Sequence, residues 1–428
     1  MTTHVPPGIS HSVGEIVAAA RHAAREVGRL PGDRKDRALA ALAAALRAER
    51  SDILVANAKD IAAAQSDGQD EAFVDRLRLT DDRVGAMADA IDTVMRLPDP
   101  VGELVDSRRM PNGLEVARRR VPLGVIAAVF ESRPNVALDI SALGLKAGNA
   151  VILRGGRESH HSTAALTSVV RDALAHVDVP PDAVQAITNP DREYVRLLLQ
   201  ARGGVDVVVP RGGPGLIDFV TKTASVPVLE TGWGVCHTYV GADANLEMAE
   251  QIVVNAKTRR PSICNALDTL LVDCAVANAF LPTVGRALGD RGVQMHADAV
   301  ATDLLTGAGE VAALVDGDLD TEWLDLRMSI VVVDGVEEAL NHIRTHGSGH
   351  SEAIVTQSLS DAEIFLDEVD AAAVYVNAST QFTDGGEFGL GAEVGISTQK
   401  LHARGPMGLR EMTTYKWVIR GDGHVRAP

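Results

Sequence analysis

Hydrophobic and polar positions follow one pattern in the first quarter of the chain and another in the rest. Between residues 13 and 97, Leu, Ile and Val recur at helical spacing among many alanines, which predicts several amphipathic helices. Two short alternating stretches then flank Pro111-Asn112-Gly113. Because Asn and Gly tolerate positive φ, residues 103–121 are predicted to form a β-hairpin.

From Leu123 to residue 209, short apolar runs alternate with helical segments, which predicts a domain built on a parallel sheet wound on both faces. A second α/β unit is expected to begin after residue 229, with a helix from about 245 to 258. The fold class is therefore α/β. The predicted strands are 123–130, 150–153, 184–187, 205–209, 269–272, 329–333, 353–356 and 373–376.

Charge and composition narrow the class of protein. The 428 residues carry a formal net charge of −17, which argues against nucleic acid as a partner. The first ten residues contain no apolar core of a signal peptide, and no later apolar run is long enough to span a membrane. Three cysteines cannot build a disulfide framework, so we expect a reducing compartment, the cytoplasm.

One thiol, Cys264, follows three cationic side chains across a proline, in the stretch from Asn255 to Ala266. A thiol attacks as the thiolate, and nearby cations lower its pKa from about 8.5. Pro261 ends the preceding helix, so Cys264 is expected on a loop. These features favour a nucleophile over the packing role usual for a free cysteine. The three cations are Lys257, Arg259 and Arg260.

The other two cysteines differ in context. Cys274 follows the apolar run Leu270-Leu271-Val272 and is expected in the core, whereas the environment of Cys236 stays open.

Two glycine turns follow predicted strands, at residues 153–158 and 209–215. Ligands of parallel sheets bind at the carboxyl ends of strands, and backbone N–H groups at a helix start favour phosphate. Neither turn has a complete dinucleotide-binding fingerprint, and tight-turn glycines are the alternative for each. The residues concerned are Arg154, Gly155, Gly156 and Arg157 in the first turn and Arg211, Gly212 and Gly213 in the second.

His342, His346 and His350 lie four residues apart, a spacing that on one helix would align three metal ligands. Gly347 and Gly349 are expected to end the helix before His350. We therefore predict no metal site.

Six segments together resemble the gamma-glutamyl phosphate reductases, the proline-biosynthesis branch of the aldehyde dehydrogenase superfamily. The resemblance runs from about Arg120 to the C-terminus, and the cysteine and Leu401–Gly408 segments are the most specific. The six are residues 133–136 (RPNV), 152–157 (ILRGGR), 255–265 (NAKTRRPSICN), 347–352 (GSGHSE), 374–379 (VYVNAS) and 401–408 (LHARGPMG).

The resemblance implies an oxidoreductase, a phosphorylating glutamate-5-semialdehyde dehydrogenase, which reduces L-glutamyl 5-phosphate with NADPH through a thioester on Cys264. It implies that the Asn135 side chain and the Cys264 backbone N–H stabilise the oxyanion. A helix N-cap is the alternative role for Asn135. Lys257, Arg259 and Arg260 would bind the anionic substrate or only activate the thiol.

The resemblance also assigns cofactor contacts. Arg154 occupies the usual place of a lysine, Arg157 favours the 2′-phosphate of NADPH, and Glu322 resembles the residue that holds the nicotinamide ribose. The glycines at 155–156 and 212–213 are also expected to bind the cofactor.

Beside these, Glu230 occupies the place of the water-activating base of hydrolytic relatives. In a reductase we expect it to position groups or relay a proton. Trp233 and Val235 depart from the family pattern and leave local substrate contacts open.

The implied domains are residues 1–229 for NADP(H) binding, including the oligomerisation hairpin 103–121, residues 230–375 for catalysis, and residues 376–428 returning to the cofactor domain and the oligomer interface. The active site is expected between the two larger parts. The resemblance implies a homo-oligomer and allows channelling from a glutamate 5-kinase. Alternatives are another NADP-dependent aldehyde dehydrogenase and a catalytically silent homologue serving as an interaction protein.

Overall fold

The computed structural model describes residues 7–426. The expectation about the first ten residues therefore falls partly on residues 1–6, outside the described range. The chain forms two compact units. Within the described residues, the first comprises residues 7–231, 389–395 and 407–426, and the second residues 232–388 and 396–406.

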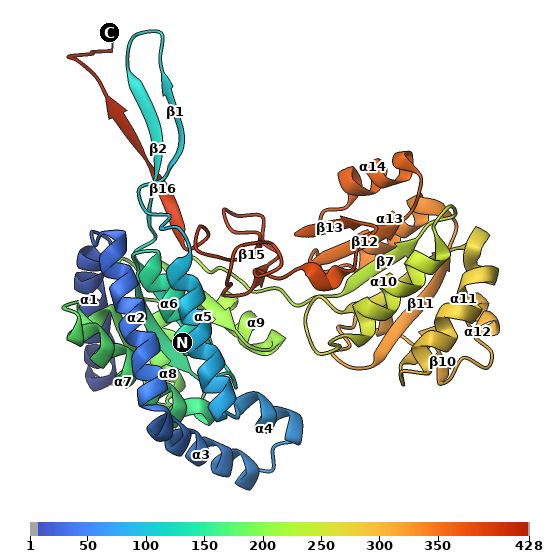
Figure 1. The fold of residues 1–428 in the computed structure, drawn as a ribbon, viewed down its shortest axis with the longest axis horizontal. Coiled ribbons are helices and arrows are strands. Elements are labelled where there is room, and N and C mark those ends of the chain that lie inside the picture. Colours follow the sequence, from blue (N-terminus) through green and yellow to red (C-terminus); the bar gives the residue numbers. More distant parts are fainter. Residues whose placement is uncertain (1–6, 427–428) are drawn as a thin grey trace. The chain divides into compact units, whose positions relative to one another are not determined.

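The first unit begins with amphipathic helices, as the spacing of its apolar residues predicts (Figure 1). Asp70 and Thr80 cap two of them, because each side-chain oxygen accepts a backbone N–H of the first turn. The helices are α1 (Pro7–Val27), α2 (Gly32–Ala48), α3 (Arg50–Ser66), α4 (Glu71–Leu77) and α5 (Asp81–Arg96).

A parallel four-stranded sheet, in the order β5-β4-β3-β6, lies at the centre of this unit. Val17 of α1 and Leu198 of α8 belong to the apolar cluster on one of its faces, and α6 packs against β4. The strands are β3 (Val125–Phe130), β4 (Ala150–Gly155), β5 (Val184–Ala186) and β6 (Val207–Arg211). The helices are α6 (Val136–Lys146), η1 (Arg157–Ser159), α7 (His160–His176), η2 (Pro181–Ala183), α8 (Arg192–Leu199) and α9 (Pro214–Thr223).

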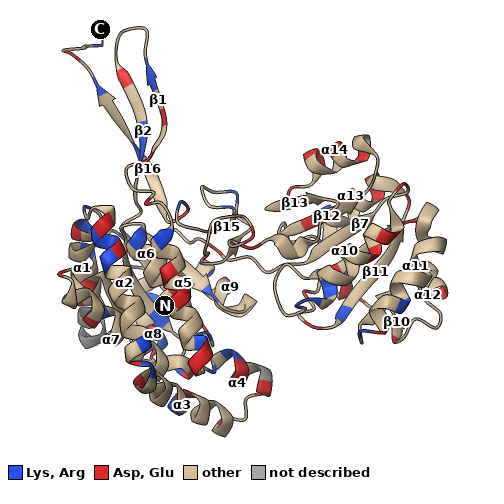
Figure 2. Ribbon diagram, in the orientation of Figure 1, with Lys and Arg blue, Asp and Glu red and all other residues tan. Residues whose placement is uncertain are grey.

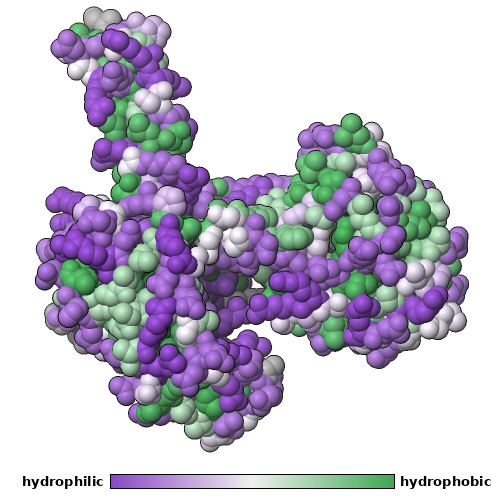
Figure 3. All heavy atoms as spheres, in the orientation of Figure 1, coloured by the Kyte–Doolittle hydropathy of each residue, from purple (hydrophilic) through white to green (hydrophobic). Residues whose placement is uncertain are grey.

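The predicted hairpin is present and gains a third strand from the C-terminus. Strands β1 (Leu104–Arg109), β2 (Glu115–Pro122) and β16 (Thr413–Arg420) form an antiparallel ribbon in the order β1-β2-β16. Arginines recur along β1 and β2 (Figure 2). Hydrophobic side chains interrupt the hydrophilic surface of the ribbon (Figure 3). The exposed ones are Leu104, Val105, Tyr415, Trp417 and Ile419.

The second unit contains a seven-stranded parallel sheet in the order β10-β9-β11-β8-β7-β12-β13. Helices α10, α11 and α12 contribute to the apolar core on one face, and α13 and α14 to that on the other. The predicted α/β class with parallel sheets is therefore confirmed. Its strands are β7 (Cys236–Val240), β8 (Leu267–Asp273), β9 (Gln294–Ala297), β10 (Val311–Ala313), β11 (Arg327–Val333), β12 (Ser351–Val355) and β13 (Ala373–Val376).

The helices of this unit are α10 (Leu246–Thr258), α11 (Cys274–Gly289), α12 (Ala299–Leu304), η3 (Asp318–Asp320), α13 (Gly335–His346), α14 (Leu359–Glu368) and η4 (Thr380–Phe382). Strands β14 (Ile396–Ser397) and β15 (Gly405–Pro406) pair separately. The expectation for Cys274 is wrong: it begins α11 and is exposed, because the apolar run before it ends with the strand. No helix within residues 7–426 is long and apolar enough to cross a membrane.

Candidate active site

Cys264 lies, half-buried, on the loop between α10 and β8, as predicted. The turn that contains η4 holds this loop. The Thr380 hydroxyl donates to the Asn265 carbonyl oxygen at 2.7 Å, and the Asn265 amide donates to the Thr383 carbonyl oxygen at 3.0 Å. The residue after the thiol is thus fixed on both its backbone and its side chain, which limits the freedom of Cys264.

Gln381 of the same turn reaches the end of α10. Its amide nitrogen donates to the Ala256 carbonyl oxygen at 2.8 Å, and its oxygen accepts from the Arg259 guanidinium at 3.3 Å. Arg259 and Arg260 are both exposed. Two of the three predicted cations are therefore accessible to an anionic ligand.

Lys257 differs from these two because its side chain is buried. Its ammonium nitrogen lies 3.7 Å from the carboxylate of Asp268, which is also buried. Burial lowers the pKa of Lys257 and raises the pKa of Asp268 to about 6, while their mutual attraction opposes both shifts. This placement favours an electrostatic or structural role for Lys257 over direct contact with substrate.

Gly234 packs against the backbone of Cys264. A Cβ atom at Gly234 would lie 1.8 Å from the Cys264 carbonyl oxygen, so only glycine fits there. The Gly234 N–H donates to the Glu322 carboxylate at 3.0 Å. The structure thus brings Glu322, predicted as a cofactor residue, to the segment that borders the candidate nucleophile.

The second thiol, Cys236, is fully buried in β7 and donates from Sγ to the Cys264 carbonyl oxygen at 3.3 Å. Burial raises its pKa well above the usual value, with nearby carboxylates adding to the effect. Cys236 is therefore held as a neutral thiol, which leaves Cys264 as the candidate nucleophile of this pair.

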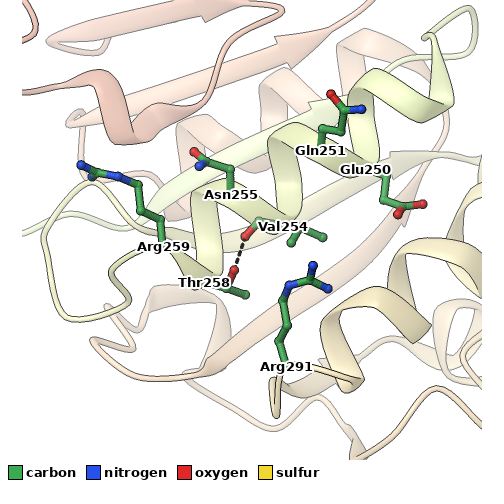
Figure 4. Close-up of a pocket in the computed structure, with 7 residues that line it drawn as sticks. All are labelled: Glu250, Gln251, Val254, Asn255, Thr258, Arg259 and Arg291. Carbon is green, nitrogen blue, oxygen red and sulfur yellow. Dashed lines mark hydrogen bonds between the residues drawn. The ribbon is translucent and has the colours of Figure 1, made fainter.

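A shallow hollow of about 400 Å³ lies along α10 (Figure 4). Cys264 does not line it, so the hollow is not assigned to the chemistry predicted for that thiol. Its lining residues are Glu250, Gln251, Val254, Asn255, Thr258, Arg259 and Arg291.

Asn135 precedes α6 in the first unit. Its side chain makes no capping hydrogen bond, so the alternative role as an N-cap is not realised. Instead its amide nitrogen donates to the Asp139 carboxylate at 2.9 Å.

Both glycine turns lie at the carboxyl ends of parallel strands, where a nucleotide would bind. Cβ atoms at Gly156 and Gly212 would lie 2.0 and 2.5 Å from carboxylate oxygens of Glu158 and Glu131, so glycine leaves room for these carboxylates beside the turns. The Gly213 N–H donates to the Glu131 carboxylate at 3.3 Å. Gly213 precedes α9, whose start has no side-chain cap. The position of both turns at the carboxyl ends of the strands, and not these carboxylate contacts, makes them candidates for the phosphates of a nicotinamide dinucleotide.

The remaining predicted cofactor contacts differ in exposure. Arg154 is buried and donates to the Pro190 carbonyl oxygen at 3.0 Å, and burial lowers its pKa. Arg157 is exposed, 3.4 Å from the Asp67 carboxylate. Arg211 is half-buried at the end of β6. An accessible guanidinium such as that of Arg157 can contact a phosphate, whereas Arg154 supports the turn from within.

The structure also places the other three residues singled out from the sequence, Glu230, Trp233 and Val235. Glu230 is half-buried and belongs to the first unit. Val235 is buried, and its N–H donates to the Ser348 hydroxyl at 2.9 Å, whereas Trp233 is exposed. Of the two residues that depart from the family pattern, only Trp233 is available to a ligand.

The histidine series does not share one helix. Helix α13 ends at His346, as predicted, and His350 is buried, with Nδ1 2.8 Å from the Ser351 hydroxyl. Burial lowers the pKa of His342 to about 3 and that of His350 to about 4. Within the described part of the chain, no group of three or more His, Cys, Asp or Glu side chains is arranged to hold a metal ion.

An α/β unit with a thiol on a tightly held loop, together with strand-end turns suited to a dinucleotide, is the arrangement of an aldehyde dehydrogenase. Residues 1–304 match the model of the aldehyde dehydrogenase family. The chain belongs to this family.

Within the family, the chain is similar to gamma-glutamyl phosphate reductases. It is 51% identical to that of Thermobifida fusca over 98% of this chain and 99% of the relative, and 52% identical to that of Roseiflexus castenholzii over 96% and 99%. The crystal structure of the Thermotoga maritima reductase superposes with a TM-score of 0.94 at 45% identity, covering 97% of this chain and 100% of that one. An acetylating aldehyde dehydrogenase of Geobacillus thermoglucosidasius shares the fold, with a TM-score of 0.69 at 18% identity over 98% and 99% of the two chains.

Sequence reasoning missed four residues around these sites. Asp268 interrupts an apolar strand, and Asp139 stands four residues after Asn135, so both carried a signal. Gly234 and Gln381 carried none, because their importance depends on chain segments distant in sequence.

Proposed function

We propose that this chain reduces L-glutamyl 5-phosphate to L-glutamate 5-semialdehyde and phosphate, a reaction of proline biosynthesis, with Cys264 as the nucleophile. The observation that carries the proposal is the loop-borne, half-buried thiol in a chain about half identical, over nearly its full length, to gamma-glutamyl phosphate reductases.

The chemistry follows from the thiol and its surroundings. The Cys264 thiolate attacks the acyl carbon, forming a C–S bond and a tetrahedral oxyanion. Collapse of this intermediate breaks the C–O bond to phosphate, which leaves, and a thioester remains. When bound, NADPH supplies the hydride that reduces the thioester, and loss of the thiolate then releases the aldehyde.

The oxyanion needs hydrogen-bond donors at both tetrahedral stages. We assign the Asn135 amide and the Cys264 backbone N–H to this role. The half-buried Glu230 is assigned a positioning or relay role, because a strong base would direct water onto the thioester and waste it as glutamate.

Substrate and cofactor binding require cationic partners. The exposed guanidinium groups of Arg259 and Arg260 are assigned to the phosphate or the α-carboxylate of the substrate. Within the nicotinamide cofactor class, we propose NADPH, because the exposed Arg157 suits the 2′-phosphate. Glu322 is assigned to the nicotinamide ribose, and the glycine turns to the phosphates.

Assembly and location complete the proposal. The exposed apolar residues of the ribbon support association with a second copy of the chain, because such residues favour burial. Delivery of the acyl phosphate by a glutamate 5-kinase remains a proposal. We propose the cytoplasm as the location, since three cysteines in a chain of this length cannot build a disulfide framework.

The phosphate requirement of the reverse reaction tests this function. The native protein is given glutamate 5-semialdehyde and NADP⁺ with phosphate, with arsenate or with neither, and cofactor reduction is followed by absorbance. We expect activity that requires phosphate or arsenate. Activity independent of both would identify a hydrolytic aldehyde dehydrogenase, and no activity would identify a silent homologue.

A further inference from the structure

The side-chain amide of Asn135 is held by one neighbour on the same helix. Asn135 lies immediately before α6, and Asp139 lies in its first turn, four residues on. At that spacing two side chains face each other, and the amide nitrogen donates to Asp139 Oδ2 at 2.9 Å. Both side chains are half-buried, so the contact belongs neither to the core nor to an open surface.

A carboxylate decides which way an amide points. It can only accept hydrogen bonds, so Asn135 must turn its nitrogen, and not its oxygen, toward Asp139. The nitrogen carries two hydrogens, and one remains for another acceptor. A protonated carboxyl group could instead donate to the amide oxygen, and the orientation would no longer be unique.

We propose that Asp139 is a positioning residue of the reaction, which holds the Asn135 amide so that it presents an N–H donor to the developing oxyanion. The proposal rests on the function proposed above and on the role assigned there to Asn135. Asp139 acts through Asn135 and is not assigned any contact with substrate. Its effect is therefore expected on the rate of the chemical step rather than on substrate affinity.

The ionisation of Asp139 makes this role dependent on pH. Burial raises the pKa of Asp139 to about 6, while the hydrogen bond from Asn135 and the charge of Arg211, at the end of β6, oppose the rise. Above this pH the carboxylate orients the amide. As the pH falls through about 6, Asp139 becomes protonated and the orientation is lost, so activity should fall on the acid side.

The test compares phosphate-dependent semialdehyde oxidation from about pH 5 to 9 in the native protein and in Asp139→Asn, Asp139→Leu, Asn135→Ala and the Asn135→Ala/Asp139→Leu double variant. Asp172→Asn, which removes an exposed carboxylate from α7, is the matched control. Thermal unfolding and the alkylation rate of Cys264 show whether each variant folds.

We expect Asn135→Ala to lower kcat about 10²-fold to 10³-fold, as for the loss of one oxyanion donor, and Asp139→Leu to lower it nearly as much with KM little changed. The double variant should be no slower than Asn135→Ala, because both changes remove one donor. Asp139→Asn should lose the part of the acid limb that falls near pH 6, since its amide does not titrate, while any loss of activity from protonation of the Cys264 thiolate remains.

Additive losses in the double variant, or an unchanged acid limb in Asp139→Asn, would overturn the inference. The pH profile of Asp139→Asn decides alone if the leucine variant does not fold. An Asn135→Ala variant with native activity would overturn both this inference and the role of Asn135. Impaired Asn135→Ala with unaffected Asp139 variants would overturn this inference only.

Discussion

The ammonium nitrogen of Lys257 lies 3.7 Å from the carboxylate of Asp268, and both side chains are buried in the unit that carries Cys264. The Asp268 carboxylate also accepts hydrogen bonds from two backbone N–H groups, that of Trp323 at 3.1 Å and that of Cys236 at 3.4 Å. This ion pair therefore connects α10 to β7 and to the segment beside Glu322.

Removing one partner of this pair should destabilise the protein. Lys257→Met leaves Asp268 buried without its counter-charge, and we expect the free energy of unfolding to fall by about 3–5 kcal/mol. Urea unfolding measures it. Arg260→Met, which removes an exposed cation from the same segment, should change it by no more than about 0.5 kcal/mol. Equal stability of the two variants would contradict a structural role for Lys257.

Gly234→Ala should displace the loop that carries the thiol. The new Cβ would lie 1.8 Å from the Cys264 carbonyl oxygen. Because that oxygen belongs to the backbone, only a movement of the backbone can remove the clash. We expect a loss of activity of about 10²-fold, because displacements of about 1 Å have such effects. Gly85→Ala, in α5 with open space around its Cβ, is the control and should retain full activity.

Truncating the exposed cations separates substrate binding from thiol activation. For Arg259→Ala and Arg260→Ala, we expect KM for glutamyl phosphate to rise about tenfold, the cost of a lost charged hydrogen bond. The rate at which iodoacetamide alkylates Cys264 should stay unchanged. Slower alkylation with unchanged KM would mean that these guanidinium groups act only on the thiol.

Arg157→Glu should change cofactor preference. A carboxylate repels the 2′-phosphate of NADPH and can accept a hydrogen bond from the ribose 2′-OH of NADH. We therefore expect KM for NADPH to rise about tenfold or more and KM for NADH to fall, measured in the reductive direction. Unchanged values for both cofactors would remove Arg157 from the cofactor site.

The parallel sheets were predictable because their buried strands are nearly continuous apolar runs. Strands β7, β9 and β10 were not predicted. In β7, His237 and Thr238 are polar although both are buried. The Glu352 carboxylate accepts from the His237 backbone N–H at 2.8 Å and lies 3.0 Å from the ring Nδ1, so it contributes to holding His237 in this buried position. Such a partner, more than a hundred residues away, leaves no local signal.

The position of Cys264 on a loop was also predictable, because Pro261 interrupts the helix before it. Which of the neighbouring cations are buried and which are exposed could not be predicted. Lys257 and Arg260 look alike in sequence, but helical geometry turns Lys257 inward, toward Asp268 on the next strand, and leaves Arg260 exposed. Only the packing of α10 against the sheet distinguishes a buried cation from a ligand-binding one.

The central claim is that Cys264 carries the acyl group. Its most direct test is rapid acid quenching of the protein with glutamate 5-semialdehyde and NADP⁺ without phosphate, followed by mass spectrometry of the peptide that contains Cys264. The account predicts a glutamyl adduct on Cys264 that disappears when phosphate is added, and no adduct in Cys264→Ser. An adduct on another residue, or phosphate-dependent turnover by Cys264→Ser, would contradict it.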